Sequence, residues 1–126
     1  MVEGDPGAAR LAGARVLVAE DEFVIALEIE TTLREFGCLV LGPTVSVADT
    51  LDLLTRERPD AALLDLNLFD GRSTPVAEAL VARGVPFAVV SAYAAAPEPV
   101  FDGVELVAKP YTAQRIRHAL PRLVGA

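Results

Sequence analysis

Four short apolar segments of this chain each end in a residue that could take part in chemistry. The first segment ends in a pair of acids, and the third ends in a single acid. The fourth ends in a hydroxyl and the fifth in an amine. In chain order these residues are Glu20 and Asp21, Asp65, Ser91 and Lys109.

Such a set, brought together, favours phosphoryl chemistry. Carboxylates about 4 Å apart repel one another by several kcal/mol at a protein-like effective dielectric. They must therefore take up protons or bind a cation. Oxygen ligands without His or Cys suit a hard ion, Mg²⁺ before zinc, and Mg²⁺ completes its shell with water and phosphate oxygens. With Lys109 and Ser91 added, the set predicts a phosphoryl-transfer site whose nucleophile is a carboxylate.

The elements that must position these residues alternate between two kinds. Apolar runs of four or five residues indicate buried strands, and stripes such as Ile25, Ile29 and Leu33 indicate helices between them. We expect strands at about 16–19, 38–41, 61–64, 87–90 and 104–108. We expect helices at about 22–36, 46–57, 73–83 and 112–123.

Local signals set the ends of these elements. Ser46 is the candidate N-cap of the second helix, and Gly37 is expected to end the first. Gly42-Pro43 is expected to end the second strand, and residues 66–72 to form a loop around the turn signal Asp70-Gly71. Proline at 97 and 99 forbids a long helix before the fifth strand, so we expect a stunted or mobile fourth helix there.

This alternation predicts an α/β fold, a flavodoxin-like doubly wound domain with a five-stranded parallel sheet covered on both faces. In that architecture ligands bind beyond the carboxyl ends of the strands, where the reactive residues stand. We expect residues 1–13 to be a flexible tail and residues 14–126 to form the domain.

Composition narrows the function classes. The chain has 126 residues, enough for one domain, and a net charge of −7 from 18 acids and 11 bases. This acidity argues against a nucleic-acid partner, and no apolar run is long enough to cross a membrane. A single cysteine, Cys38, and an N-terminus without signal-peptide character fit a cytoplasmic protein.

Four motifs in this order resemble a response-regulator receiver domain. They are Val16-Leu17-Val18-Ala19-Glu20-Asp21-Glu22, Leu63-Leu64-Asp65-Leu66-Asn67, Val90-Ser91-Ala92 and Lys109-Pro110, and the resemblance covers residues 14 to 124. It implies that Asp65 accepts a phosphoryl group from the histidine of a sensor kinase.

The resemblance also implies roles for the other residues. Asp21 and Asp65 would bind Mg²⁺ through their side chains, Glu20 directly or through water, and Asn67 through its backbone carbonyl. Lys109 would pair with the phosphoryl group or Asp65, helped by a cis Lys109-Pro110 bond, and Ser91 would swing toward the phosphoryl oxygen.

The sequence departs from the usual receiver pattern at its switch aromatic. Three positions before the lysine stands Leu106, where receivers carry an aromatic residue. The segment Pro86 to Tyr93 instead resembles the Pro-Phe-x-Phe-Ala-Thr-Gly-Tyr motif of an atypical subgroup, the FATGUY receivers, with Val89 for Phe and Ala92 for Gly. Tyr93 is expected to take over part of the aromatic role.

We therefore interpret the chain as a stand-alone receiver, not a turnover enzyme, that signals by phosphorylation-dependent protein–protein interaction. Its expected partners are a sensor histidine kinase, a phosphotransfer protein and a downstream protein target. The first helix, through Glu22 and Phe23, is the expected kinase-docking surface. Phe69, exposed by position, is either a partner contact or a lid.

Three alternatives stay open at this point. One is a Mg²⁺-dependent phosphatase with an aspartyl nucleophile, although such enzymes place the nucleophile after the first strand with an acid two residues on. Here the candidate follows the third strand, and position 67 is Asn. The others are a pseudo-receiver scaffold and a receiver cut from a larger protein.

Overall fold

The computed structural model describes residues 11–91, 98–108 and 113–124. Its five main strands form one parallel sheet in the order β2-β1-β3-β6-β7. The strands are β1 (Arg15–Ala19), β2 (Leu39–Thr44), β3 (Ala61–Asp65), β6 (Phe87–Ser91) and β7 (Glu105–Ala108). The helices are α2 (Phe23–Glu35), α3 (Val47–Arg56), α4 (Thr74–Ala82) and α5 (Ala113–Val124). The predicted flavodoxin-like fold is confirmed.

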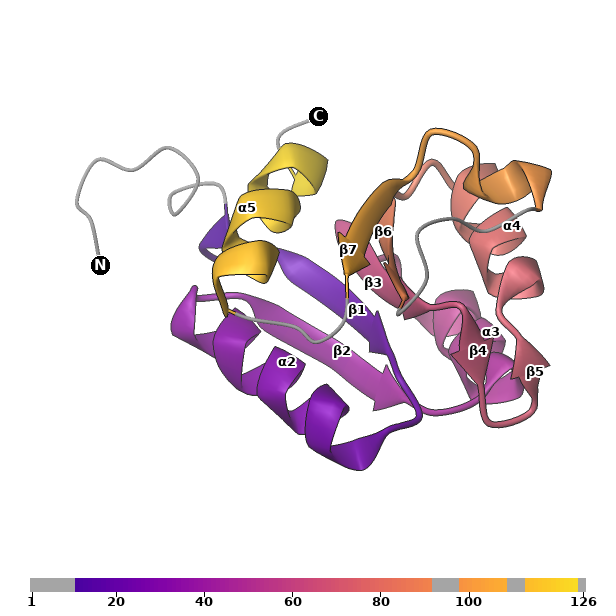
Figure 1. The fold of residues 1–126 in the computed structure, drawn as a ribbon, viewed down its shortest axis with the longest axis horizontal. Coiled ribbons are helices and arrows are strands. Elements are labelled where there is room, and N and C mark those ends of the chain that lie inside the picture. The colour runs from indigo at the N-terminus through magenta and orange to yellow at the C-terminus, as the bar shows by residue number, and fades with distance from the viewer. Residues whose placement is uncertain (1–10, 92–97, 109–112, 125–126) are drawn as a thin grey trace.

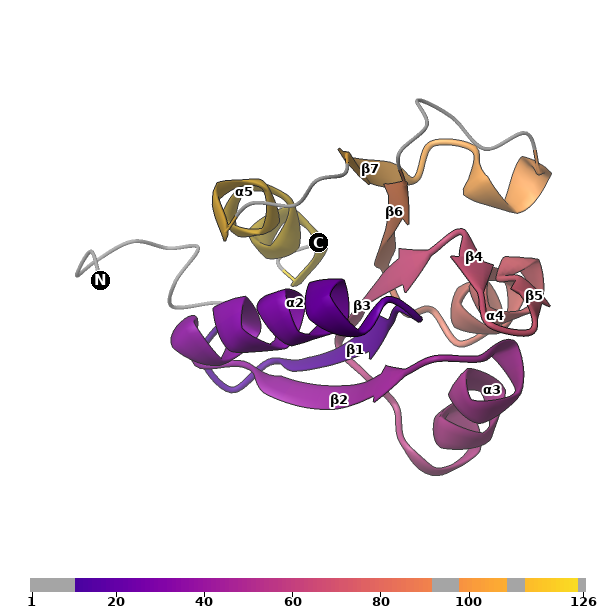
Figure 2. The same ribbon diagram turned by 60° about the horizontal axis from the view of Figure 1, so that its bottom comes forward.

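The sheet separates two apolar cores. Figure 1 and the turned view in Figure 2 show α2 and α5 on one face, and α3 and α4 on the other. Strand β1 serves both cores, because side chains alternate along a strand. Val16 and Val18 pack with α2 and α5 in what we term the first core, whereas Leu17 and Ala19 pack with α3 and α4 in the second core.

Helix α2 forms where the apolar stripe predicts it. Ile29 and Leu33 are fully buried in the first core. The helix ends at Glu35, and Gly37 follows its C-cap with a φ of +85°, the left-handed conformation that glycine adopts most readily. The N–H of Cys38 then donates to the Leu33 carbonyl (3.0 Å), which satisfies one of the last helix carbonyls.

Two side chains cap the start of α3. The Ser46 hydroxyl accepts from the Asp49 N–H (3.0 Å), so the predicted N-cap is confirmed. The Asp70 carboxylate accepts from the N–H groups of Val47 (2.6 Å) and Ala48 (3.1 Å). The free N–H groups of the first helical turn are therefore bonded partly by a distant loop.

The segment between β3 and α4 differs from the expected loop. It is a small antiparallel hairpin of β4 (Asn67–Leu68) and β5 (Gly71–Arg72), in which Asn67 pairs with Arg72. The N–H of Phe69, in its two-residue turn, donates to the Val45 carbonyl (2.9 Å). The turn signal at Asp70-Gly71 is correct, but the residues on either side of the turn pair as short strands, and the Asp70 contacts hold the turn against α3.

The prediction that β2 ends at Gly42-Pro43 is wrong. The strand continues to Thr44, and its pairing with β1 becomes irregular between Leu17 and Ala19. Gly42 has a φ of +95°, and a Cβ there would stand 2.8 Å from the Val18 carbonyl oxygen. Glycine therefore lets the strand pass this irregularity, and the Glu20 N–H still bonds to the Thr44 carbonyl (2.9 Å).

Two further segments differ from what the sequence predicts, one near the N-terminus and one between β6 and β7. Leu11, within the segment expected to be a flexible tail, is 2% exposed and belongs to the first core. Between β6 and β7, the described residues contain a single 3₁₀ turn, η1 (Pro99–Phe101), where a stunted fourth helix was expected. Residues 92–97 lie outside the described part of the chain. No helix within that part is long and apolar enough to cross a membrane.

Candidate functional site

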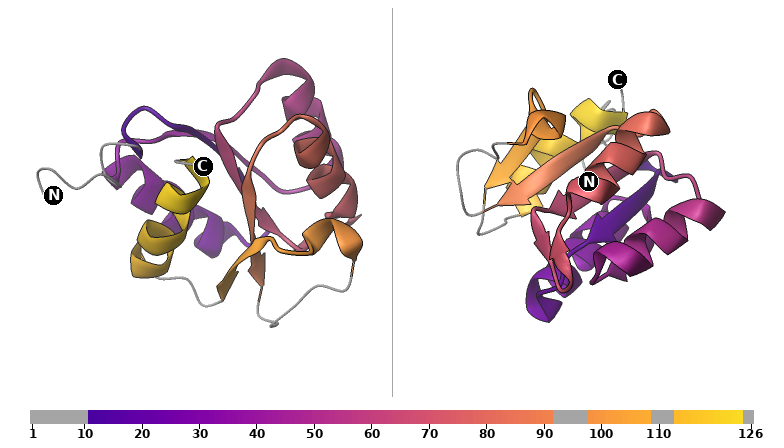
Figure 3. Two further views of the ribbon diagram at one scale, coloured as in Figure 1. Left: turned by 90° about the horizontal axis from the view of Figure 1, so that it is seen from above. Right: turned by 90° about the vertical axis from the view of Figure 1, so that its right-hand side faces the viewer.

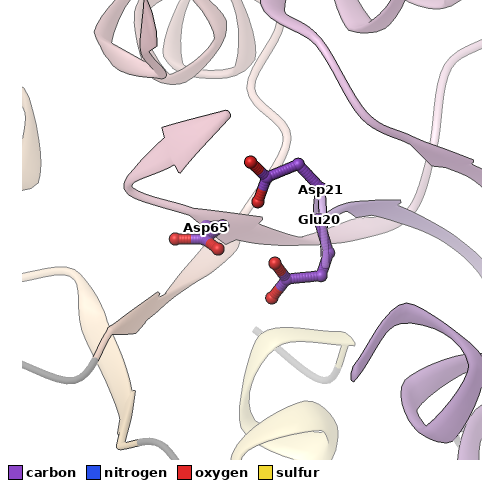
Figure 4. A group of neighbouring side chains, drawn as sticks. All are labelled: Glu20, Asp21 and Asp65. Atoms are coloured by element: carbon purple, nitrogen blue, oxygen red, sulfur yellow. The ribbon is translucent and has the colours of Figure 1, made fainter. Parts of the chain in front are cut away.

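Three acids meet at the carboxyl ends of β1 and β3. Glu20 and Asp21 directly follow β1, and Asp65 is the last residue of β3. One carboxylate oxygen from each lies within 4.8 Å of the others. Figure 4 shows Glu20 and Asp21 extending from the same stretch of chain, with Asp65 beside them. Parallel strands bring their carboxyl ends to one edge, which is why acids 44 positions apart in sequence become neighbours (65 − 21).

Backbone hydrogen bonds hold the Glu20 side of the cluster. The Glu20 N–H donates to the Thr44 carbonyl of β2, and the Glu20 carboxylate accepts from the Glu22 N–H (3.2 Å). Glu20 is 1% exposed and Asp65 6%, whereas Asp21 is exposed. The cluster is thus buried in the protein at Glu20 and Asp65 and open to solvent at Asp21.

The chain after Asp65 is equally constrained. The Asn67 N–H donates to Asp65 Oδ1 (3.3 Å), while the Asn67 side chain is exposed. The Leu66 carbonyl accepts from both the N–H (2.9 Å) and the hydroxyl (3.0 Å) of Ser73. These bonds fix the path of residues 65–67, so the backbone next to the acids has a defined position.

Ser91 ends the strand next to Asp65. In the sheet register Asp65 pairs with Val90, and Ser91 pairs with Ala108. Figure 3 shows the arrowheads of β6 and β7 side by side at one edge of the sheet. Ser91 is buried, with 4% of its surface exposed. Lys109, the Lys109-Pro110 bond and Tyr93 lie outside the described residues, so their expected roles stay predictions.

The donor set fits a hard divalent cation. All three side chains offer carboxylate oxygens, and at these separations their mutual repulsion amounts to several kcal/mol at an effective dielectric of about 20. A bound cation removes that repulsion, and oxygen ligands favour Mg²⁺ over softer metals. The open side beside Asp21 leaves room for the waters that Mg²⁺ retains.

Sequence reasoning missed two residues next to this site. Arg72 of β5 forms an ion pair with Glu98 and also contacts the Asn67 side chain. Neither residue belongs to a motif, and 26 positions separate them. Only the pairing of Asn67 with Arg72 across a two-residue turn could have suggested that Arg72 lies near the site.

Two exposed apolar side chains lie on the β4–β5 hairpin and on β7. Phe69, in the hairpin turn, is 81% exposed, and Leu106 on β7 is 36% exposed. Leu106 stands at the strand position where, by the resemblance described above, receivers usually carry an aromatic residue.

The chain is similar to several proteins of known description. It is 30% identical over 113 residues to the sensory transduction protein LytT of Bacillus cereus, covering 86% of this chain and 46% of that protein. The chain spans about half the length of the curated relatives it matches. No family model matches it.

Solved structures resemble both the fold and the sequence. The receiver domain of the sensor histidine kinase PA1611 from Pseudomonas aeruginosa, with a magnesium ion coordinated in its active-site cleft, is 26% identical with a TM-score of 0.80. The match covers 91% of this chain and 100% of that one. SdrG from Sphingomonas melonis is 34% identical with a TM-score of 0.76, covering 90% and 98% of the two chains.

Proposed function

This chain belongs to the receiver domains of two-component response regulators, and we propose that it accepts a phosphoryl group on Asp65 from a sensor histidine kinase. The observation that carries this proposal is the meeting of three carboxylates within 4.8 Å at the ends of β1 and β3. The modified domain then signals through a phosphorylation-dependent interaction with another protein.

The reaction is a transfer between two nucleophiles. A carboxylate oxygen of Asp65 attacks the phosphorus of a phosphohistidine, the P–N bond breaks, and an acyl phosphate forms on Asp65. The electron pair of the broken bond stays on the imidazole nitrogen. Asp65 is suited to this role because its strand and the Asn67 N–H fix its carboxylate.

Mg²⁺ is the cofactor that this donor set would hold. Asp21 and Asp65 would bind it by their side chains, Glu20 directly or through water, and Asn67 by its backbone carbonyl. When bound, Mg²⁺ supplies positive charge to the phosphoryl oxygens during transfer. The likeness to the PA1611 receiver domain, which carries a coordinated magnesium ion, supports this assignment.

Two further residues complete the proposed site. Lys109 pairs its ammonium with the phosphoryl oxygens, and the Ser91 hydroxyl donates to one of them. Ser91 ends the strand adjacent to β3, and its sheet partner Ala108 directly precedes Lys109. Ser91 would therefore come from the strand next to β3, and Lys109 from the end of the strand beyond it.

The kinase-docking surface is proposed to lie at the start of α2. Phe23 is 78% exposed, Val24 66% and Leu27 50%, an apolar face that begins two residues after Asp21. Truncating Phe23 or Leu27 to Ala should slow phosphorylation by the kinase and leave labelling by a small phosphodonor unchanged. Leu39→Ala, at an equally exposed leucine on β2, is the matched control. Equal kinase rates for all variants would count against this surface.

Binding of beryllofluoride, which forms a phosphoryl-like adduct with a carboxylate oxygen, tests the proposed site. We expect the amide resonances of Asp65, Asn67 and Ser91 to shift when both Mg²⁺ and beryllofluoride are present. Asp65→Asn should abolish the shift, and Asp70→Asn should not. One solved structure of SdrG is described as its BeF3-activated conformation, which makes the probe appropriate.

Other results would indicate the alternatives. Steady turnover of small phosphate esters would favour an aspartyl phosphatase, whereas response-regulator receivers are generally not turnover enzymes. Absence of both Mg²⁺ and beryllofluoride effects would favour a pseudo-receiver that serves only as a binding scaffold.

We also propose a stand-alone role, which the match to 98% of the SdrG chain supports.

A further inference from the structure

Arg72 and Glu98 form a two-point ion pair beside the candidate site. Arg72 Nε lies 2.5 Å from Glu98 Oε2, and Arg72 Nη2 lies 2.9 Å from Glu98 Oε1. The Thr74 hydroxyl also donates to Glu98 Oε2 (3.3 Å). Paired N–H···O bonds of this kind fix direction as well as distance. The bond from Arg72 is the main reason why the pKa of Glu98 falls to about 2, so the pair is charged at neutral pH.

The same guanidinium also reaches the loop of the phosphoacceptor. Arg72 Nη1 donates to the Asn67 side-chain oxygen (3.4 Å), and the two residues pair across the β4–β5 hairpin. The Asn67 N–H in turn donates to Asp65 Oδ1. A continuous series of hydrogen bonds therefore runs from Asp65 through Asn67 and Arg72 to Glu98.

Glu98 stands at the entrance to η1. Its carbonyl accepts from the Phe101 N–H (3.0 Å), and Phe101 is 7% exposed in the core shared with α4. Glu98 thereby joins the turn that follows β6 to the hairpin that follows β3. These are the continuations of the two strands that end in Ser91 and Asp65.

We propose that Arg72 is a positioning residue of the phosphotransfer site, coupling the Asp65–Asn67 loop to η1 through Glu98. The proposal rests on the proposed phosphotransfer function for its role in signalling. A phosphoryl group on Asp65 adds about −1.5 to −2 charge. That charge competes with Glu98 for the Arg72 guanidinium, so phosphorylation weakens the pair and loosens η1.

The first test of the coupling needs no phosphorylation. The variants are Arg72→Gln, which removes the charge and shortens the side chain, and Glu98→Gln, which removes the charge and keeps the side-chain shape. Arg56→Gln, which breaks the exposed Arg56–Asp52 pair on α3, is the control. Amide NMR and hydrogen exchange report on Asn67 and on the η1 amides of Phe101 and Asp102.

We expect Glu98→Gln to shift the Asn67 amide resonance, although among the described residues only Arg72 hydrogen-bonds to both. The η1 amides should exchange at least about threefold faster in both test variants, as for the loss of a partly exposed ion pair. Arg56→Gln should change neither. An unshifted Asn67 resonance in Glu98→Gln would overturn the coupling, whether or not η1 is loosened.

A second arm adds Mg²⁺ and beryllofluoride. In the wild-type protein we expect faster exchange at Phe101 and Asp102, and in Arg72→Gln no further change. An equal response in both proteins would overturn the coupling role of Arg72. No response at Asp65 in the wild-type protein would instead contradict the phosphotransfer function, and the first arm would still decide the coupling.

Discussion

At the scale of single residues, charge is the dominant feature of the site. Glu20 and Asp65 are buried, and Asp21 completes a group of three carboxylates within 4.8 Å. Cation binding relieves their repulsion, so Mg²⁺ should stabilise the folded state through preferential binding.

We predict that Mg²⁺ raises the Tm of the wild-type protein and binds Asp21→Asn at least about tenfold more weakly. The reason is the loss of one carboxylate–cation attraction, on the order of a few kcal/mol at such distances. Asp21 is exposed, so this variant should fold. Calorimetric titration measures the affinity, with Asp52→Asn on α3 as the control. Equal affinities for Asp21→Asn and wild type would remove Asp21 from the site.

Cys38 provides a second prediction at this scale. Burial raises the pKa of its thiol to about 11, and its Sγ lies 3.4 Å from the Leu11 carbonyl oxygen. The thiolate is the reactive form of cysteine, so Cys38 should resist alkylation at pH 8 in the native protein and react promptly in denaturant. Intact mass after iodoacetamide treatment checks this. Rapid native labelling would show that the packing around Leu11 opens readily.

At the scale of elements, the β4–β5 hairpin is held against α3 as well as against η1. Asp70 accepts from the N–H groups of Val47 and Ala48, and these bonds lower the pKa of its carboxyl. The bond from Val47 has the larger effect on this pKa. The hairpin thus contributes to α3 a cap that the local sequence of the helix does not contain.

This cap predicts a pH dependence. Because the folded-state pKa of Asp70 lies below its ordinary value of 3.8, its stabilising effect is present above that pH. The effect is lost as the pH falls through the lower folded value. We expect Asp70→Asn to be less stable than wild type in urea unfolding at pH 6, with the gap narrowing below about pH 3.8. A gap that stays constant down to pH 2 would contradict the charge-based cap.

At the scale of the whole molecule, the sheet divides the interior into two cores that share no helix. Leu33 of α2 is fully buried in one, and Leu80 of α4 is fully buried in the other. Each core depends on the same sheet, but the two leucines pack against opposite faces of it.

We predict that Leu33→Ala and Leu80→Ala each lower the free energy of unfolding by about 2–5 kcal/mol. Since the two leucines belong to different cores of the described residues, the double variant should equal the sum to within about 0.5 kcal/mol. Urea unfolding measures all three. A large departure from additivity would indicate that the sheet transmits strain between the cores.

Much of this architecture was predictable from the sequence, because most elements carry their own signals. The stripe of α2, the Ser46 cap and the apolar strands are local patterns with a direct physical meaning. The passage of β2 through Gly42-Pro43 was not predictable, since proline and glycine usually end a strand. The hairpin was not predicted because its strands have only two residues each, too few to show an apolar pattern. The Arg72–Glu98 pair was not predicted because 26 positions separate its partners.

Intact mass spectrometry tests the central claim most directly. The protein is incubated with Mg²⁺ and acetyl phosphate, beside Asp65→Asn and a sample treated with a chelator. Acceptance of a phosphoryl group on Asp65 predicts the addition of one phosphoryl group to the wild-type protein, lost in both controls. Equal labelling of Asp65→Asn would contradict it, as would a wild-type protein that neither gains mass nor binds Mg²⁺.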